Sequence, residues 1–581
     1  MRLRQVSFVI VLAACLGAGA AARQAPAAGG GLASIQPAEL HTWLSYIASD
    51  DLNGRRTFSE GLGLAAAYIS DHLRAWGLRP AGDDGLYLQR VAVRGIKSTS
   101  HSTLTVTVNG HTRTFTDGDG IEFPKNVGAK RRFTADDIEF LGYGLDAPLA
   151  HHDDYAGRDV KGKVVVWLGP KGPAGLDQQL YRRALSGRSR FATDQSGALG
   201  AIGPELPGRG AFNRDDTPPG LPKADFTTAQ RLDHELPPTV TAKDDVLTFL
   251  FSAAPASYAD LKAKADAGEA LPSFRLSGVS LTFTLDDDYE VVRTRYTHNV
   301  VAVLEGSDPV LKQTYVAFGA HYDHVGYAQG ELTKDDQGQE KRLGAVGRVT
   351  DGAFGDRIWN GADDDGSGTV TLLALAKAFA TGPRPKRSLL FVWHAGEEEG
   401  LWGSRYFVDH PTVPLDQVVT QLNMDMVGRD RDNKASEENT VYIVGSDRIS
   451  TELHNIDVAA DAALPHPLTL DYEMNDPTDL EQVYYRSDHY SYAATGIPII
   501  FFTTGLHPDY HANTDSVDKI HFEKMARIGQ LVYETGWRVA ELGHAPVRDN
   551  KGPRAGKGFH GLLPMKSTTQ QGGRSRRRLA R

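Results

Sequence analysis

The sequence has very little cysteine and no long apolar run, and both absences limit what the protein can be. Its single cysteine, Cys15, excludes an intramolecular disulfide and any zinc site built from several thiolates. A bound metal would therefore have to rest on histidine and carboxylate side chains. Beyond residue 23 no apolar stretch approaches the ~20 residues that span a bilayer, so we expect no transmembrane segment in the mature chain.

The sequence also lacks an excess of positive charge. It has 63 Lys and Arg residues against 73 Asp and Glu residues, a formal net charge of -10, which argues against a nucleic-acid partner. With 581 residues, the chain is long enough for at least two domains. Its 40% hydrophobic and 23% charged residues are typical of globular proteins and exclude wholesale disorder.

The N-terminus predicts export. Arg2 and Arg4 precede an apolar run over residues 6–14, which is too short to cross a bilayer and is typical of a signal peptide, here residues 1–22. Small residues before Cys15 fit a lipoprotein signal, which would leave an N-terminal lipid anchor on that cysteine, whereas residues 20–22 fit ordinary cleavage. Both alternatives stay open, and either predicts a periplasmic or secreted protein.

The composition and hydrophobic periodicity of the chain change along its length. We expect a flexible leader over residues 23–36 and a disordered basic tail over residues 546–581. Residues 101–289 are β-rich and irregular, with a period-two strand that ends at the turn signal Asn109-Gly110. We interpret them as an insertion into one discontinuous domain made of residues 37–100 and 290–545.

The second part of that domain predicts an α/β sheet. Apolar strands over 315–318, 389–393, 418–422 and 497–502 alternate with helical stretches, the last an amphipathic helix over 520–542. Acidic and histidine residues stand directly after these strands or open the next helix, where the ligands of open α/β sheets bind. They are His321, Asp323, His324, Asp363, Asp364, Asp365, Glu397, Glu398, Glu399, Asp425 and His511, with Tyr510 beside the last.

This convergence predicts a metal site. Several carboxylates meeting at one edge of a sheet would repel one another, and a pair of cations would relieve the repulsion. Histidine and carboxylate ligands suit zinc, and two zinc ions can activate a water and polarise a carbonyl group. Of the adjacent Glu397 and Glu398, one can be a ligand and the other the base that moves the proton. The residues alone therefore predict metal-assisted hydrolysis, without naming the substrate.

Five motifs give the chain a resemblance to the di-zinc aminopeptidases of metallopeptidase clan MH, which include bacterial leucyl aminopeptidases, glutamate carboxypeptidase and the catalytically inactive transferrin receptor. The resemblance covers most of residues 37–545. It implies an α/β fold with a mixed central sheet flanked by helices. The motifs, in the order of the family, are Gly-Ala-His-Tyr-Asp-His-Val-Gly, Asn-Gly-Ala-Asp-Asp-Asp-Gly-Ser-Gly, Gly-Glu-Glu-Glu-Gly-Leu-Trp-Gly-Ser, Asn-Met-Asp-Met-Val-Gly and Asp-Tyr-His.

The resemblance also implies roles for single residues. His321 and Asp425 would hold one zinc ion and Glu398 and His511 the other, with Asp364 between them. The choice of Asp364 rests on aligning the Ser-Gly pair that follows, and in relatives a cis peptide bond follows this residue. By the same resemblance Glu397 is the general base, Asp323 orients the ring of His321, and Tyr510 donates a hydrogen bond to the oxyanion.

Three further segments resemble parts of such enzymes. Residues 101–289 resemble a protease-associated domain, which would either influence substrate access or only pack. Residues 486–489, Arg-Ser-Asp-His, resemble a segment near the substrate pocket and make His489 a candidate substrate contact. The long polar loop over 325–358 departs from the family pattern and predicts an extra flap near the metal site.

We therefore expect an exported zinc aminopeptidase that removes N-terminal residues from peptides. A carboxypeptidase or dipeptidase on the same metal site is the nearest alternative, because a few pocket residues decide which terminal charge is bound. A glutaminyl cyclase is a further related outcome. A non-catalytic binding or scaffold protein is the alternative from another class. The preferred terminal residue and the oligomeric state are not determined by the sequence.

Overall fold

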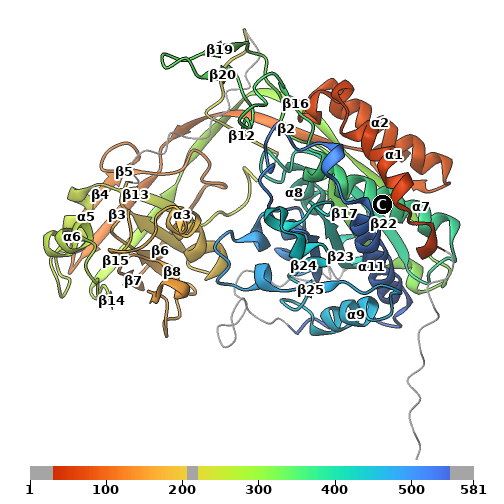
Figure 1. The fold of residues 1–581 in the computed structure, drawn as a ribbon. Helices are drawn as coiled ribbons and strands as arrows, with labels where there is room; N and C mark the ends of the chain where they lie inside the picture. The colour runs from red at the N-terminus through yellow and green to blue at the C-terminus, as the bar shows by residue number, and fades with distance from the viewer. Residues whose placement is uncertain (1–30, 206–219, 230, 550–581) are drawn as a thin grey trace, which may run out of the picture.

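The computed structural model describes residues 31–205, 220–229 and 231–549, as two bodies joined by a long β-ribbon (Figure 1). The predicted signal peptide, Cys15 and most of the predicted leader and tail lie outside the described residues. No helix within the described ranges is both long and apolar enough to cross a membrane. The larger body carries the central sheet, and the inserted body, residues 103–285 apart from strand β12 (Phe226–Thr228) of the central sheet, carries two smaller sheets.

The central sheet is mixed, in agreement with the predicted fold class. Four strands run parallel at its centre, in the order β22 (Ser388–His394), β17 (Tyr315–His321), β23 (Val418–Met424) and β26 (Ile499–Thr503). Their carboxyl ends therefore meet at one edge. The antiparallel neighbours are β16 (Asp287–Leu304), which pairs with β22, and β24 (Thr440–Val444), which pairs with β26. The sheet is completed by β2 (Leu88–Ser100), β12 (Phe226–Thr228), β25 (Thr469–Asp471) and β1 (Arg79–Pro80).

Helices cover both faces of this sheet. Side chains that alternate along β17 point to opposite faces, Phe318 into one apolar cluster and Ala317 into another. The larger cluster includes residues of α1 (Pro37–Ile47), α2 (Glu60–Ala75), α7 (Gly368–Thr381), α9 (Thr451–Asp461) and α11 (Phe522–Glu541). The cluster on the other face includes residues of α8 (Trp402–Asp409) and α10 (His489–Ala493). The long helix predicted over 520–542 is thus α11.

The inserted body contains a four-stranded and a six-stranded sheet around one apolar cluster. The first comprises β4 (His111–Thr116), β3 (Thr103–Val108), β15 (Val279–Leu285) and β6 (Arg131–Ala135). The second comprises β14 (Ser273–Arg275), β7 (Ile138–Leu141), β10 (Val164–Val166), β11 (Gly200–Gly203), β13 (Thr239–Ala242) and β5 (Ile121–Glu122). Its helices are α3 (Arg182–Ser186), α4 (Arg188–Arg190), α5 (Asp244–Leu250) and α6 (Tyr258–Ala267). The predicted turn at Asn109-Gly110 joins β3 to β4, with φ of 48° and 86°.

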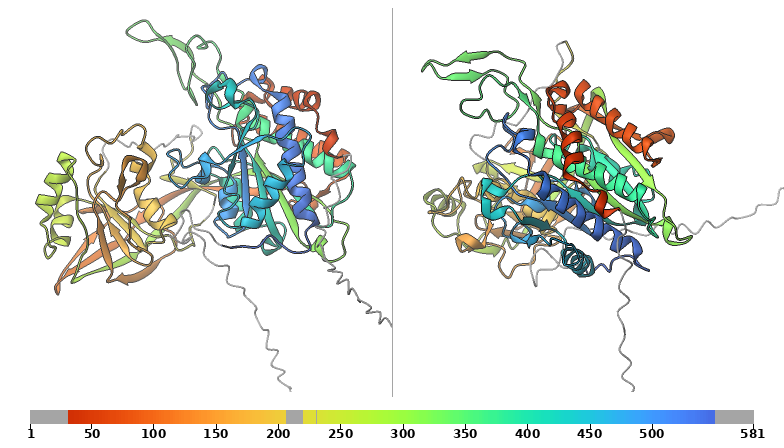
Figure 2. Two further views of the ribbon diagram at one scale, coloured as in Figure 1. Left: turned by 60° about the horizontal axis from the view of Figure 1, so that its bottom comes forward. Right: turned by 45° about the vertical axis from the view of Figure 1, so that its right-hand side comes forward.

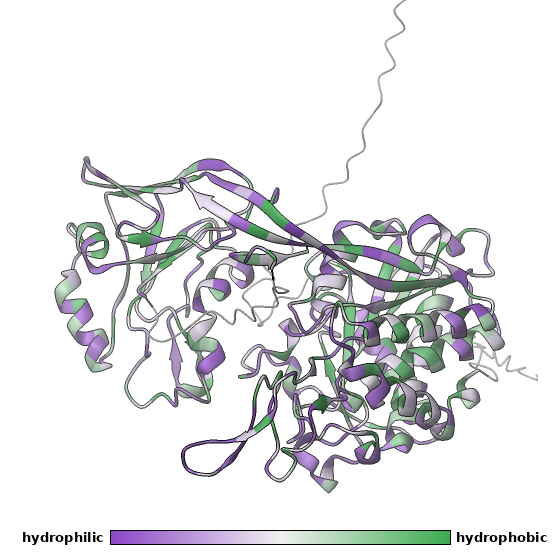
Figure 3. Cartoon of the chain, turned by 90° about the horizontal axis from the view of Figure 1, so that it is seen from above, coloured by the Kyte–Doolittle hydropathy of each residue, from purple (hydrophilic) through white to green (hydrophobic). Residues whose placement is uncertain are grey.

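Strands β2 and β16 form the ribbon between the bodies (Figure 3). They pair antiparallel from Leu88 opposite Val300 to Ser100 opposite Asp287. At the end near the inserted body, the buried Asp287 carboxylate accepts hydrogen bonds from the hydroxyls of Ser98, Ser100 and Ser102 at 3.1, 2.7 and 2.7 Å. The domain boundaries predicted from the sequence stay a prediction.

The predicted flap over residues 325–358 has its own secondary structure. Strands β19 (Leu332–Lys334) and β20 (Glu340–Arg342) form a hairpin that projects from the larger body (Figure 2). Strands β18 (Gly326–Tyr327) and β21 (Ile358–Trp359) pair at its base. A further small pair, β8 (Asp146–Ala147) with β9 (His152–Asp153), belongs to the inserted body.

One buried carboxylate should make the stability of the fold depend on pH. Asp457 of α9 is fully buried against α11, and its Oδ1 accepts a hydrogen bond from the hydroxyl of Thr535 at 2.8 Å. Burial, with a contribution from Asp461, raises the pKa of Asp457 to about 7. The folded state therefore binds the proton more tightly than the unfolded state, so this residue should lower the free energy of unfolding as pH rises from about 4 to about 7.

We expect Asp457→Asn to remove the part of the pH dependence of the unfolding free energy that comes from this carboxyl group. Between pH 5 and pH 8 the parent protein should lose roughly 3 kcal/mol of unfolding free energy that the variant keeps, since one pKa unit corresponds to about 1.4 kcal/mol. Urea unfolding at the two pH values measures the difference, with the exposed Asp119→Asn as the matched control. Identical pH slopes for the parent and Asp457→Asn would contradict the assignment.

Candidate metal centre

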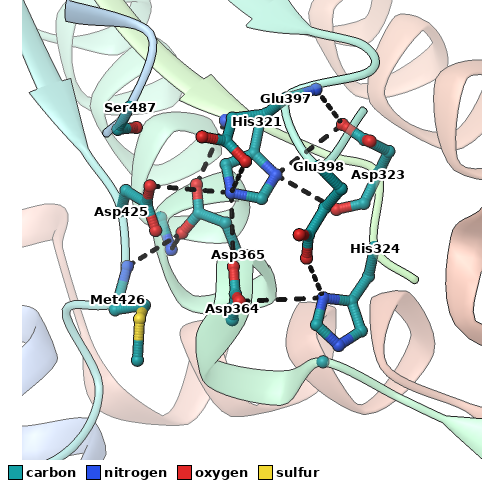
Figure 4. Close-up of polar contacts among 12 residues, drawn as sticks. His321, Asp323, His324, Asp364, Asp365, Glu397, Glu398, Asp425, Met426 and Ser487 are labelled. Atoms are coloured by element: carbon teal, nitrogen blue, oxygen red, sulfur yellow. Dashed lines mark hydrogen bonds and ion pairs between the residues drawn. The ribbon is translucent and has the colours of Figure 1, made fainter. Parts of the chain in front are cut away.

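The loops at the carboxyl edge of the four parallel strands bring the predicted residues together (Figure 4). His321 is the last residue of β17, Asp425 follows β23, and Glu397 and Glu398 lie shortly after the end of β22. Asp364 comes from the turn that opens α7, and His511 from the segment after β26. Each loop thus contributes side chains to one cluster, because parallel strands end at the same edge.

The first group of possible ligands lies around His321. Its Nε2 is 3.3 Å from Asp364 Oδ1 and 3.6 Å from Asp425 Oδ2. On the other side of the ring, Nδ1 lies 3.1 Å from the backbone carbonyl oxygen of Asp323. A proton on Nδ1 that is donated to this carbonyl leaves the lone pair of Nε2 free to face the two carboxylates.

The second group lies around Glu398. His511 Nε2 is 3.0 Å from Glu398 Oε2 and also 3.0 Å from Asp364 Oδ2. His324 Nδ1 is 2.8 Å from Glu398 Oε1 and 3.9 Å from Asp364 Oδ2. The two oxygens of Asp364 therefore face different groups, Oδ1 toward the first and Oδ2 toward the second.

The three consecutive aspartates have distinct environments. Asp363 Oδ1 accepts a hydrogen bond from the Gly428 amide at 2.7 Å. Asp365 Oδ1 accepts from the amides of Gly368 and Met426 at 2.9 and 3.2 Å, and its Oδ2 from the amide of His321 at 3.1 Å. Asp364 is the one whose two oxygens face both groups, whereas Asp365, which also holds backbone, lies with His321 and Asp425 in a set of side chains close enough to share a metal ion. The peptide bond from Asp364 to Asp365 is cis, as the resemblance predicted.

The donor atoms of both groups fit divalent cations. Several buried donor atoms face one another closely but make no hydrogen bond of good geometry within the described residues, namely His321 Nε2, His324 Nδ1 and Nε2, Asp364 Oδ2 and Glu398 Oε1. Such atoms are costly to bury unless an ion or a water pairs with them. Imidazole nitrogens and carboxylate oxygens are the ligands that zinc accepts where thiolates are lacking.

The charges within the cluster also favour the binding of divalent cations. Burial by itself would lower the pKa of His321, but Asp425, Asp323 and Asp364 raise it well above its ordinary value. Burial would likewise raise the pKa of Asp364, yet the neighbouring imidazoles of His321 and His511 hold it well below the usual range. The carboxylates that stabilise a proton on each imidazole would equally stabilise a divalent cation in front of it.

Asp323 and Glu397 lie beside the first group. Asp323 is fully buried, with Oδ1 3.7 Å from His321 Nδ1 and Oδ2 accepting a hydrogen bond from the Thr57 hydroxyl at 3.0 Å. Its Oδ1 also accepts from the Glu397 amide at 3.2 Å. The Glu397 carboxylate faces the cluster, with Oε2 3.9 Å from His321 Nε2. Burial, and to a smaller extent Asp425 and Glu398, raises the pKa of Glu397 well above its ordinary value.

A pocket opens directly onto the cluster. It encloses about 460 Å³ including its mouth, a size typical of small-ligand sites. Asp364, Glu397, Asp425, Tyr510 and His511 line it, together with Arg486, Ser487 and several apolar residues. The Tyr510 ring stacks on His511 at 4.1 Å between centroids. Its hydroxyl accepts a hydrogen bond from Arg486 Nη2 at 3.0 Å.

The structure places His489 away from the pocket. Its side chain is fully buried, Nε2 donates to the Tyr484 carbonyl oxygen at 2.8 Å, and the ring stacks on Phe501 at 4.4 Å. Burial lowers the pKa of His489 to about 3, so the ring is neutral. This geometry is that of a packing residue. Arg486 and Ser487 of the same segment are the ones that line the pocket.

Sequence reasoning placed His324 and Arg486 near the site but assigned neither of them a role. His324 stands in a predicted strand-end motif, but nothing in the sequence tells whether its ring turns toward Glu398. The predicted flap also reaches the site, since the Arg348 amide donates to the His511 carbonyl oxygen at 2.7 Å. Arg348 Nη2 donates to the Tyr510 carbonyl oxygen at 3.1 Å. The flap thus anchors the backbone of two predicted site residues.

Comparisons with known proteins find similarity to aminopeptidases. The profile described as Peptidase family M28 matches residues 299–536. The chain is 29% identical over 260 residues to a probable leucine aminopeptidase of Arthroderma benhamiae, covering 41% of this chain and 67% of that protein. It is 31% identical over 186 residues to Aminopeptidase YwaD of Bacillus subtilis, covering 30% and 36% of the two chains.

Solved structures similar to this chain include an aminopeptidase from Aneurinibacillus sp. strain AM-1, at a TM-score of 0.42 and 18% identity, covering 89% of this chain and 97% of that one. A glutaminyl cyclase from Porphyromonas gingivalis has a TM-score of 0.31 at 18% identity, covering 41% of this chain and 76% of that one.

The geometry predicts that His324 contributes to metal retention in the second group. His324→Ala should lower the content of bound zinc after dialysis against a weak chelator, because Glu398 loses a buried imidazole neighbour. Inductively coupled plasma mass spectrometry of the dialysed protein measures this. The exposed His466→Ala is the matched control and should keep the parent's content. Equal zinc content in His324→Ala and the parent would exclude His324 from metal retention.

Proposed function

We propose that this protein is an exported zinc aminopeptidase that hydrolyses N-terminal residues from peptides, which the match of residues 299–536 to peptidase family M28 supports. The observation that carries the proposal is the position of Asp364. Its two oxygens lie 3.3 Å from His321 and 3.0 Å from His511, so one carboxylate can serve two ions at once.

The ligand set follows from the two groups. His321 and Asp425 would hold one zinc ion, Glu398 and His511 the other, and Asp364 both. When bound, two zinc ions lower the pKa of a water and polarise the carbonyl group of the peptide bond. The buried donor atoms of this cluster that make no hydrogen bond of good geometry among the described residues support the set.

Glu397 is the proposed general base. It lines the pocket, and its carboxylate lies beside the first group without taking part in the short contacts around Glu398 or Asp364. Its carboxylate would accept the proton of the attacking water and pass it to the leaving amine. Asp323 supports this arrangement by holding the Glu397 amide with one oxygen while the same carboxylate lies next to His321 Nδ1.

Tyr510 is the proposed oxyanion donor. Its hydroxyl lines the same pocket as Glu397, so an oxygen that develops negative charge there can receive its hydrogen bond. Arg486 Nη2 donates to this hydroxyl, which leaves the hydroxyl proton free to point into the pocket.

Export and the identity of the inserted body belong to the same proposal. The predicted signal peptide of residues 1–22 would direct the protein to the periplasm or the exterior, with a lipid at Cys15 as one processing outcome. The inserted body is proposed to be a protease-associated domain. The two β-sheets that form most of the inserted body support this assignment.

A carboxypeptidase or dipeptidase is the second candidate. Arg486 favours it, since a guanidinium in the pocket can bind the terminal carboxylate of a short peptide. Hydrolysis of a Leu-initiated tripeptide, followed by mass spectrometry, separates the candidates. Release of free Leu from the unblocked peptide, and its loss on N-acetylation or chelation, supports the aminopeptidase. Cleavage from the other end, indifferent to acetylation, replaces it with a carboxypeptidase, and no cleavage by a zinc-loaded protein favours a scaffold.

Glu397→Gln should abolish turnover and leave the zinc content nearly unchanged. The variant removes the base but none of the proposed ligands. Because general base catalysis typically contributes about 10²- to 10⁴-fold to the rate, activity should fall about 1,000-fold or more. Glu399→Gln is the matched control from the same run of glutamates, because the Glu399 carboxylate lies 3.8 Å from Arg56 instead of facing the cluster. Loss of zinc from Glu397→Gln would overturn the assignment of Glu397 as a base that is not a ligand.

A further inference from the structure

One short segment of the larger body docks on the inserted body. We call residues 480–482 the docking segment. Leu480 packs against the apolar cluster of the inserted body. Gln482 Oε1 accepts a hydrogen bond from Arg190 Nη2 of α4 at 3.4 Å. The residue between them, Glu481, makes the stronger contacts and points its carboxylate at α3.

Glu481 is held by two arginines of α3. Its Oε1 accepts a hydrogen bond from Arg182 Nη2 at 2.9 Å, and its Oε2 accepts one from Arg183 Nε at 2.7 Å. The Glu481 side chain is 29% exposed, so these pairs are partly shielded from water. Charge-assisted bonds of this length are stronger than neutral ones, and two of them fix the direction of the carboxylate.

The turn that carries Glu481 is held in place by Asp479. The carboxylate of Asp479 accepts hydrogen bonds from the amides of Glu481 and Val483 at 3.1 and 2.8 Å. A short 3₁₀ turn over Val483–Tyr485 follows and leads directly to Arg486. The backbone therefore keeps a set spacing between the docking segment and Arg486.

Arg486 joins the docking segment to the pocket. Its Nη1 donates to Glu481 Oε2 at 3.1 Å, and its Nη2 donates to the Tyr510 hydroxyl at 3.0 Å. The guanidinium is planar and presents both donors in one rigid fork, so the position of Glu481 sets the direction of the bond to Tyr510. A lysine could make only one of these contacts well.

The charges make the arrangement depend on Glu481. Its carboxylate lies among the guanidinium groups of Arg182, Arg183 and Arg486, which would otherwise repel one another. With the carboxylate neutralised, Arg486 would move away from α3 and from its place beside Tyr510.

We propose that the inserted body positions Tyr510. Arg182 and Arg183 hold Glu481, Glu481 holds Arg486, and Arg486 holds the Tyr510 hydroxyl in the pocket. The role of Tyr510 as oxyanion donor rests on the proposed function, but the positioning itself does not. Glu481 and Arg486 are thus positioning residues, and the oxyanion donor takes its working position only when the inserted body is docked.

The kinetic test removes the contribution of α3. Full-length, zinc-loaded Arg182→Gln/Arg183→Gln should hydrolyse a Leu-initiated tripeptide with kcat about tenfold lower and KM within about twofold, because a misplaced oxyanion donor weakens the transition state more than the ground state. Glu481→Gln should likewise lower kcat and leave KM nearly unchanged. Adding Glu481→Gln to Arg182→Gln/Arg183→Gln should lower kcat little further. Arg190→Gln is the matched control, since Arg190 contacts the docking segment outside this path, and it should keep both constants.

Hydrogen exchange tests the positioning without any activity. In the Arg182→Gln/Arg183→Gln and Glu481→Gln proteins, amide exchange should rise in peptides covering 480–490 and also in those covering 507–513, whereas Arg190→Gln should leave 507–513 unchanged. Faster exchange confined to 480–490 would overturn the proposal, as would an unchanged kcat in Arg182→Gln/Arg183→Gln alongside a reduced one in Glu481→Gln. A protein that shows the exchange pattern but cleaves no peptide would refute the proposed function and leave the positioning intact.

Discussion

The convergence of like charges at one edge of a sheet is the constraint on which the rest of this structure depends. Asp364, Glu397, Glu398 and Asp425 are brought together by loops that follow parallel strands, and they would repel one another in a buried site. Imidazoles placed between the carboxylates offset part of that repulsion, and divalent cations would offset the rest. Such a cluster can be stable only if the surrounding backbone is held rigidly enough to keep it assembled.

The surroundings provide that rigidity through buried polar groups outside the proposed ligand set. Asp363 and Asp365 hold backbone amides, and Asp515 accepts hydrogen bonds from the amides of Asp363 and Asp364 at 3.0 to 3.1 Å. Arg55 is fully buried and donates to the carbonyl oxygens of Tyr322, Ile47, Asn360 and Gly361 at 2.6 to 3.1 Å. Segments far apart in the chain are thereby tied together on two sides of Asp364.

The inserted body is joined to the larger body by the ribbon and also contacts it near the pocket. The ribbon of β2 and β16 attaches it to the edge of the central sheet, whereas its contact near the pocket is made through a few charged side chains around Glu481. A contact of that kind is specific in geometry and modest in energy, because its members are partly exposed. It suits a role in positioning Tyr510 better than a role in holding the two bodies together.

The sequence by itself determined the fold class, the parallel strands and the residues at their ends, because period-two and helical patterns report burial and because strand-end positions share one edge. The resemblance of the motifs then assigned roles, including the choice of Asp364. Only the tertiary structure decided which way each side chain turns. It turned Asp363 and Asp365 toward backbone amides, His324 toward Glu398, and His489 into the core. It also joined α3 to Arg486 through Glu481, across about 300 residues, a contact that depends on the docking of two bodies and leaves no periodic signal.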